Sequence, residues 1–194
     1  MIDNERNIAF WDSAAERHGD GSAAFAGMLM EGREFEALYR VQAEQERFLT
    51  LFDCRPTASV LEVGSGGGRW AFFLAARIAR YVGLDISPKM VAIADAERAR
   101  RGLENARFEC ASLLDYTSDR PFDLVFFSGV LQYIDDATIA TTLAKASRML
   151  APGGFFVSRD SVQIEERVVK AGDYPVIYRT PEEYRRLFEA AGFE

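Results

Sequence analysis

From residue 59 to residue 159 the chain alternates short apolar segments with longer amphipathic ones, and this alternation limits the folds open to it. The apolar segments predict strands over 59–63, 81–85, 106–110, 122–128 and 155–159. The amphipathic segments predict helices over 69–80, 87–101 and 135–150. Strands that alternate with helices at this spacing imply right-handed crossovers. The expected fold is α/β: a doubly wound, mostly parallel sheet with helices on both faces.

The flanking segments complete a single expected domain over residues 1–194. Helices are predicted over 4–18 and 31–52, and the second should bury Phe35, Leu38, Tyr39 and Phe48 on one face. The predicted parts are an N-terminal helical cap (1–54), a cofactor-binding core (55–160), a hairpin or lid (161–180) and a helix (181–192).

Composition narrows the partners that we expect. The chain has 194 residues, 48% of them hydrophobic, and a net charge of −7. An acidic balance without basic runs argues against nucleic acid. Cys54 and Cys110 fit no metal-binding spacing, so we expect no metal. Neither a signal peptide nor a membrane-spanning apolar run is evident, which predicts a soluble, cytoplasmic protein.

A glycine cluster follows the first strand, in the stretch LEVGSGGGRW over residues 61–70. In such sheets, ligands bind beyond the carboxyl ends of the strands, so the cluster should lie in a ligand crevice. A phosphate-binding P-loop needs Lys followed by Ser or Thr here, and this chain has Arg69 and Trp70. The looser dinucleotide pattern fits Gly66, Gly68 and Ala71, which keeps a nicotinamide- or flavin-dependent oxidoreductase open.

Glu62 distinguishes between these ligands. A carboxylate at the end of the first strand disfavours a pyrophosphate and favours a ligand with a cationic group. Here the chain resembles the Rossmann-fold (class I) S-adenosylmethionine-dependent methyltransferases, whose first motif has the form (E/D)-x-G-x-G-x-G. The matching residues, with the serine between them, are Glu62, Gly64, Ser65, Gly66 and Gly68. The resemblance implies S-adenosylmethionine as cofactor and S-adenosylhomocysteine as product.

The resemblance covers roughly residues 55 to 160 and assigns further cofactor contacts. It implies that Asp85 holds both ribose hydroxyls and that Ile86 and Met90 pack near the adenine. Ser112 stands where the family often has Asp, and the Leu113 amide could reach a ring nitrogen. Further assignments are Ser128 and Gly129 at the methionyl end, Tyr133 facing the acceptor, and Trp11 over the cofactor or in the core.

The expected function is methyl transfer to a small-molecule acceptor, on oxygen or nitrogen, such as a sugar or a natural-product intermediate. A non-catalytic adenosyl-binding module is a further alternative. For a hydroxyl acceptor, His18 is the candidate base and Tyr133 an orienting partner. The family's sheet normally has seven strands, and this sequence ends as the sixth would begin. The last two strands would then be missing. Either this sequence is shorter than the natural chain, or the hairpin or a partner subunit in a homodimer shields the edge of the fifth strand.

Overall fold

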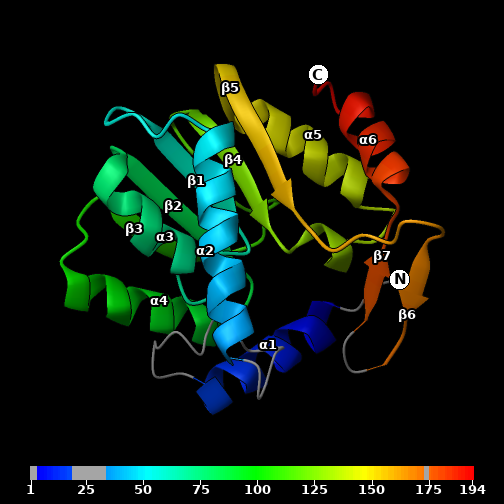
Figure 1. Ribbon diagram of the computed structural model, residues 1–194, viewed down its shortest axis with the longest axis horizontal. Helices are drawn as coiled ribbons and strands as arrows, with labels where there is room; N and C mark the ends of the chain where they lie inside the picture. The colour runs from blue at the N-terminus through cyan, green and yellow to red at the C-terminus, as the bar shows by residue number, and fades with distance from the viewer. Residues whose placement is uncertain (1–3, 19–33, 173–174) are drawn as a thin grey trace.

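The structure of the chain is a computed structural model, which describes residues 4–18, 34–172 and 175–194 (Figure 1). A parallel sheet has the strand order β3-β2-β1-β4-β5. These strands are β1 (Ser59–Val63), β2 (Arg80–Asp85), β3 (Ala106–Cys110), β4 (Phe122–Ser128) and β5 (Leu150–Arg159). The strand order reverses between β1 and β4, which is where such sheets bind ligands.

Helices cover both faces of the sheet, as the sequence predicts (Figure 1). On one face, α2 (Glu34–Leu51), α3 (Arg69–Leu74) and α4 (Pro88–Arg101) contribute to a core with Val60, Tyr81 and Phe126. On the other, α5 (Ile139–Met149) and α6 (Pro181–Ala190) pack with strand residues such as Leu61 and Phe127. Strand residues therefore alternate between two cores, and both faces are buried.

The apolar face predicted for α2 is confirmed at Phe48 and wrong at Leu38 and Tyr39. Tyr39 is 77% exposed and Leu38 is also exposed, whereas Ala37 and Phe48 are buried. The side chain of Phe35 lies outside the described residues. The Phe48 ring lies 5.0 Å from Trp70 and 5.3 Å from Phe126, measured between ring centroids. Packing against these two rings selects the buried face at Phe48.

Several predicted element bounds also change, among them the helix predicted over 135–150, which spans Ile139–Met149. The helix predicted over 69–80 ends at Leu74 and continues only as the short 3₁₀ helix η2 (Ala75–Arg77). Asn105 Nδ2 donates to the carbonyl oxygens of Ala75 and Ile78, which stabilises this early end. Strand β5 starts at Leu150 and not at the predicted residue 155. The Ala-Pro-Gly-Gly segment at 151–154 belongs to the strand, and the pairing with β4 is irregular there.

The remaining elements lie beyond the carboxyl ends of the strands. Helix α1 (Asn4–His18) packs on α4. The predicted hairpin contains the antiparallel strands β6 (Val168–Lys170) and β7 (Val176–Tyr178). Figure 1 shows α1 and this hairpin on the side toward which β5 points. The capping box of Thr180 and Glu183 starts α6. Within the described residues, no helix has both the length and the apolar character needed to cross a membrane.

Candidate functional site

The turn after β1 requires glycine for two different reasons. Gly64, Gly66 and Gly68 all have positive φ, at 79°, 51° and 88°. A Cβ on Gly64 would lie 2.0 Å from Val130 Cγ2, so no side chain fits there. A Cβ on Gly66 would meet no atom within 4 Å. Gly64 therefore allows close packing, and Gly66 presents bare backbone to open space.

Asp85 fixes this turn at the end of β2. Its Oδ2 accepts a hydrogen bond from the Gly66 amide at 2.8 Å, and its Oδ1 accepts one from the Ser87 amide at 2.9 Å. Burial raises the pKa of Asp85, and these two backbone hydrogen bonds oppose that shift. Each carboxylate oxygen keeps a further lone pair. The carboxylate is thus oriented at the edge of the crevice and can still accept from a ligand's hydroxyls.

Glu62 is 1% exposed, and one of its carboxylate oxygens lacks a partner. The Tyr81 hydroxyl donates to Oε2, while Oε1 has no hydrogen bond within the described parts of the chain. The hydroxyl of the buried Ser65 also lacks a partner there. Burial raises the pKa of Glu62 well above its ordinary value, against the attraction of Arg69. A buried carboxylate of this kind fits the cationic part of S-adenosylmethionine.

The end of β4 supplies the opposite side of the crevice. Trp70 Nε1 donates to the Ser128 hydroxyl at 3.1 Å, and this link joins α3 to β4. The Gly129 amide donates to the Arg159 carbonyl at 2.7 Å, which carries the β4 to β5 pairing past the last strand residue. Ser128 and Gly129 are half-buried. They lie beside the glycine turn, since Val130 occupies the space next to Gly64.

The predicted adenine contacts are less uniform. Ile86 is half-buried directly after Asp85. Met90 is buried in a small cluster with residues of α1, and Trp11 packs against that cluster. Ser112 donates its hydroxyl to Asp115, and the Leu113 side chain lies in the core, which leaves its amide as the predicted contact. The structure therefore gives Met90, Ser112 and the Leu113 side chain packing or capping partners within the chain.

Helix α1 contacts the segment after β4 that carries Tyr133. Trp11 meets Tyr133 edge to face, with 6.0 Å between ring centroids, and Tyr133 ends the 3₁₀ helix η3 (Leu131–Tyr133). The Ser87 hydroxyl donates to Asp12, which ties α1 to the start of α4. His18 is the last residue of α1, and its side chain lies outside the described residues.

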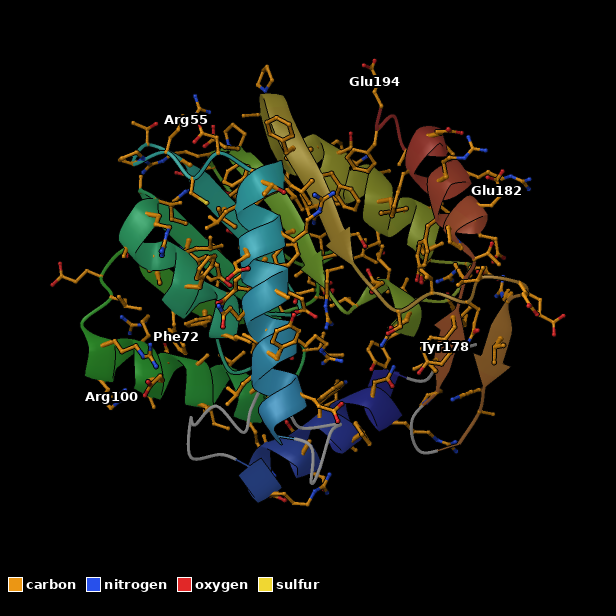
Figure 2. All side chains as sticks on the ribbon, viewed as in Figure 1. Arg55, Phe72, Arg100, Tyr178, Glu182 and Glu194 are labelled. Atoms are coloured by element: carbon orange, nitrogen blue, oxygen red, sulfur yellow. The ribbon has the colours of Figure 1, made fainter. Side chains whose placement is uncertain are left out.

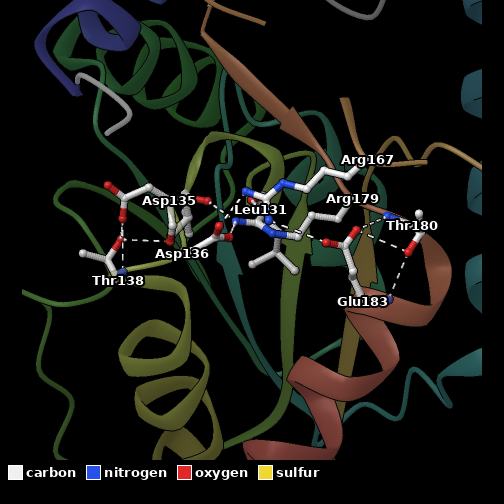
Figure 3. Close-up of polar contacts among 9 residues, drawn as sticks. Leu131, Asp135, Asp136, Thr138, Arg167, Arg179, Thr180 and Glu183 are labelled. Carbon is white, nitrogen blue, oxygen red and sulfur yellow. Dashed lines mark hydrogen bonds and ion pairs between the residues drawn. The ribbon is translucent and has the colours of Figure 1, made fainter. Parts of the chain in front are cut away.

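A buried arginine links the hairpin to the loop after β4 (Figure 3). Arg179 donates to the carbonyls of Leu131 at 2.9 Å and Ile134 at 2.7 Å, and to Asp136 Oδ1 at 2.8 Å. Arg167 pairs with the other oxygen of Asp136. Because Tyr133 lies between the two carbonyls in sequence, Arg179 positions the predicted acceptor loop. Sequence reasoning missed this contact, since nothing local in the chain marks an arginine 48 residues from its partner.

A hollow of about 660 Å³ lies at the amino ends of the strands, and its lining includes Ser59, Arg80, Asn105 and Arg107. None of the predicted site residues lines it. Within the described ranges, no group of three or more His, Cys, Asp or Glu side chains is arranged to hold a metal. The candidate site is therefore the crevice at the carboxyl ends of β1, β2 and β4.

Comparison with known proteins agrees with this assignment. Residues 60–154 match the family described as "Methyltransferase domain". Phosphoethanolamine N-methyltransferase of Triticum aestivum is 28% identical over 149 residues, which are 75% of this chain and 29% of that protein. Trans-aconitate 2-methyltransferase of Methylobacterium nodulans is 36% identical over 111 residues, which are 56% of this chain and 40% of that protein.

Among solved structures, the complex of DhpI with S-adenosylhomocysteine (SAH) superposes with a TM-score of 0.68 at 26% identity. The match covers 96% of this chain and 86% of that one. The fold, the glycine turn with its two carboxylates and these matches define the class: the chain belongs to the class I S-adenosylmethionine-dependent methyltransferases. It spans less than half the length of the two curated relatives named above.

Proposed function

We propose that the chain binds S-adenosylmethionine at the carboxyl edge of its sheet and transfers the methyl group to a small-molecule acceptor. One observation carries the proposal: the buried Glu62 oxygen without a partner and the Asp85 carboxylate flank a turn whose Gly66 faces open space. A cationic group and a pair of hydroxyls on one ligand satisfy both carboxylates. The relatives' names, which describe methyltransferases of phosphoethanolamine and trans-aconitate, support a small acceptor.

In this proposal Asp85 accepts from the ribose hydroxyls, Ile86 and Met90 border the adenine, and Ser112 and Leu113 lie at its far edge. Glu62, Ser65 and the turn glycines hold the methionyl part together with Ser128 and Gly129, and Trp11 covers the crevice. The bound cofactor supplies an electrophilic methyl group on a sulfonium. The chain's own contribution is to align the acceptor with that methyl group and to exclude water.

For a hydroxyl acceptor we propose His18 as the base and Tyr133 as an orienting hydrogen-bond partner. His18 ends α1, the helix whose Trp11 contacts Tyr133. His18→Ala should lower kcat at least about a hundredfold, the usual scale of general-base catalysis. Turnover of the unmodified enzyme should rise with pH through the histidine range. If the His18→Ala variant turns over at the rate of the unmodified enzyme, His18 is not the base, and the acceptor is an amine or another residue is the base.

Calorimetric titration with SAH and with NAD tests the cofactor assignment. We expect SAH to bind and NAD to bind much more weakly, because Glu62 repels a pyrophosphate. Methyl-labelled S-adenosylmethionine with a panel of small alcohols, amines and acids then identifies the acceptor. Tighter binding of NAD would favour an oxidoreductase. SAH binding without transfer to any member of the panel would favour a non-catalytic adenosyl-binding module.

A further inference from the structure

Three arginines converge on one glutamate at the mouth of the crevice. Glu44, in α2, accepts from Arg69 Nη1 at 3.1 Å and from Arg159 Nε at 3.0 Å and Nη2 at 2.5 Å. Arg40 Nε lies 3.5 Å from the same carboxylate, one helical turn away. Arg69 is the first residue of α3 and Arg159 the last residue of β5, so both stand at the carboxyl edge of the sheet.

The guanidinium of Arg159 lies beside Gly129, at the start of the segment that leads from β4 to Tyr133. A Cβ built on Gly129 would lie 3.5 Å from Arg159 Nη1. That nitrogen has no hydrogen-bond partner in the described parts of the chain, and neither have Nε and Nη2 of Arg69. The two side chains are 35% and 25% exposed, so their free N–H groups are only partly hydrated. Both therefore retain donors that a ligand can use.

The three arginines outnumber the carboxylates with which they form ion pairs. Glu44 is the carboxylate that pairs with them, one negative charge against three positive. Two further acids attract these arginines from a longer range, Glu62 acting on Arg69 and Asp160 on Arg159, but their hydrogen bonds go to other groups. Glu62 binds the Tyr81 hydroxyl, and Asp160 accepts from Ser158 and from the Leu131 amide. Glu44 leaves Nη1 of Arg159 and Nε and Nη2 of Arg69 unused, so the cluster keeps guanidinium donors at the carboxyl ends of the strands.

We propose that Arg159 and Arg69 bind an anionic group of the methyl acceptor, a carboxylate, phosphate or phosphonate, beside Gly129. This inference rests on the proposed function and narrows its acceptor class to anionic small molecules. Guanidinium forks recognise such groups through paired hydrogen bonds, and Glu44 holds both forks in place. An anion fixed at this point orients the rest of the acceptor toward the cofactor, which is the main contribution that methyl transfer requires.

The test is calorimetric titration of the SAH-saturated protein at low ionic strength. The probes are phosphoethanolamine and trans-aconitate, each paired with an analogue that lacks the anion, namely ethanolamine and the trimethyl ester of trans-aconitate. We expect at least one anionic probe to bind and its analogue not to bind. Arg159→Gln should weaken that binding by at least about tenfold, and Arg69→Gln by a similar factor.

Arg55→Gln is the matched control, because Arg55 is an exposed arginine at the opposite end of the molecule from the hairpin residue Tyr178 (Figure 2). It should change anion binding by less than about twofold. The affinity for SAH and the unfolding midpoint, measured on each variant, show that the crevice is intact. Arg159→Lys should restore part of the lost binding, since it keeps the charge but not the fork.

Three results would overturn this inference. The first is an SAH-saturated protein that binds neither anion, and the second is an Arg159→Gln variant that binds them unchanged. The third is a loss of at least about tenfold in SAH affinity in that variant, which would assign the guanidinium to the carboxylate of the cofactor. Absence of SAH binding to the unmodified protein would instead refute the proposed function itself, and this inference with it.

Discussion

The two halves of the crevice are built in different ways. On the cofactor side, the turn after β1 lies against the end of β2. Asp85 accepts a hydrogen bond from the Gly66 amide, and most of the other contacts join backbone groups. On the proposed acceptor side, side chains from distant segments meet, as Arg179 does with the loop after β4 and Glu44 with Arg159. The cofactor half depends on backbone shape, and the acceptor half depends on buried or half-buried charge. A site built from backbone shape tolerates few substitutions. A site built from side-chain charges can acquire a different ligand specificity when those side chains are replaced.

The largest effect should come from Gly64→Ala, because this change attacks backbone shape. The new Cβ would overlap Val130 at 2.0 Å in a left-handed conformation. We expect the free energy of unfolding to fall by about 3 kcal/mol or more and SAH binding to be lost. Urea unfolding and calorimetry measure the two effects.

Gly102→Ala is the control for that variant. Gly102 has a similar φ of 64°, but a Cβ there meets no atom within 4 Å. Only the conformational cost of about 1–2 kcal/mol should appear, with SAH binding retained. Equal losses in both variants would show that the contact with Val130 does not matter.

Asp85→Ala should come next, with an effect on binding. A carboxylate that accepts from two ligand hydroxyls contributes on the order of 2–3 kcal/mol, so SAH affinity should fall about 30- to 150-fold. Circular dichroism should show that the fold survives. Asp95→Ala, which removes an exposed carboxylate paired with Arg98, should leave affinity unchanged. Unchanged affinity in the Asp85 variant would place the ribose elsewhere.

Arg179→Lys tests the acceptor half and should separate it from the cofactor half. Lysine cannot reach two carbonyls and Asp136 together, so the free energy of unfolding should fall by about 2 kcal/mol. Amide exchange should become faster over residues 130–136, while SAH affinity stays within about threefold. Arg167→Lys, at the surface of the same network, should change little. A loss of SAH affinity as large as that of Asp85→Ala would contradict the separation of the two halves.

Asp136→Asn should have the smallest effect. Although burial alone would raise it, hydrogen bonds from Arg167 and Arg179 lower the pKa of Asp136 from its ordinary value of 3.8. A lowered pKa stabilises the fold above the ordinary value, and this contribution is lost as the pH falls through the lowered one. At pH 7 the variant should be less stable by about 1 kcal/mol or less. Unfolding midpoints across pH should show this difference shrinking below pH 3.8, and a difference that grows there would contradict the assignment.

The cofactor half can be predicted from local sequence patterns, and the acceptor half cannot. Strand β1, Glu62, the glycine turn and Asp85 form short consecutive units, and their residue types alone indicate a strand end, a left-handed turn and a carboxylate in a crevice. The parallel sheet and its two-sided core follow from the alternation of elements, whereas the strand order comes from the structure. Glu44 and Arg159 are 115 residues apart, and no local pattern pairs them. The burial of Leu38 and Tyr39 in α2 was mispredicted for a related reason: the apolar residues of this helix allow two faces, and contact of Phe48 with the rings of Trp70 and Phe126 selects one.

A crystal structure of the protein with SAH tests the central claim most directly. We expect the ribose hydroxyls within hydrogen-bonding distance of the Asp85 carboxylate, about 3 Å, with the methionyl part between Gly64 and Ser128 and its ammonium directed toward Glu62. An adenosyl group bound anywhere else, for example in the hollow beside Arg80 and Arg107 at the amino ends of the strands, would contradict this claim.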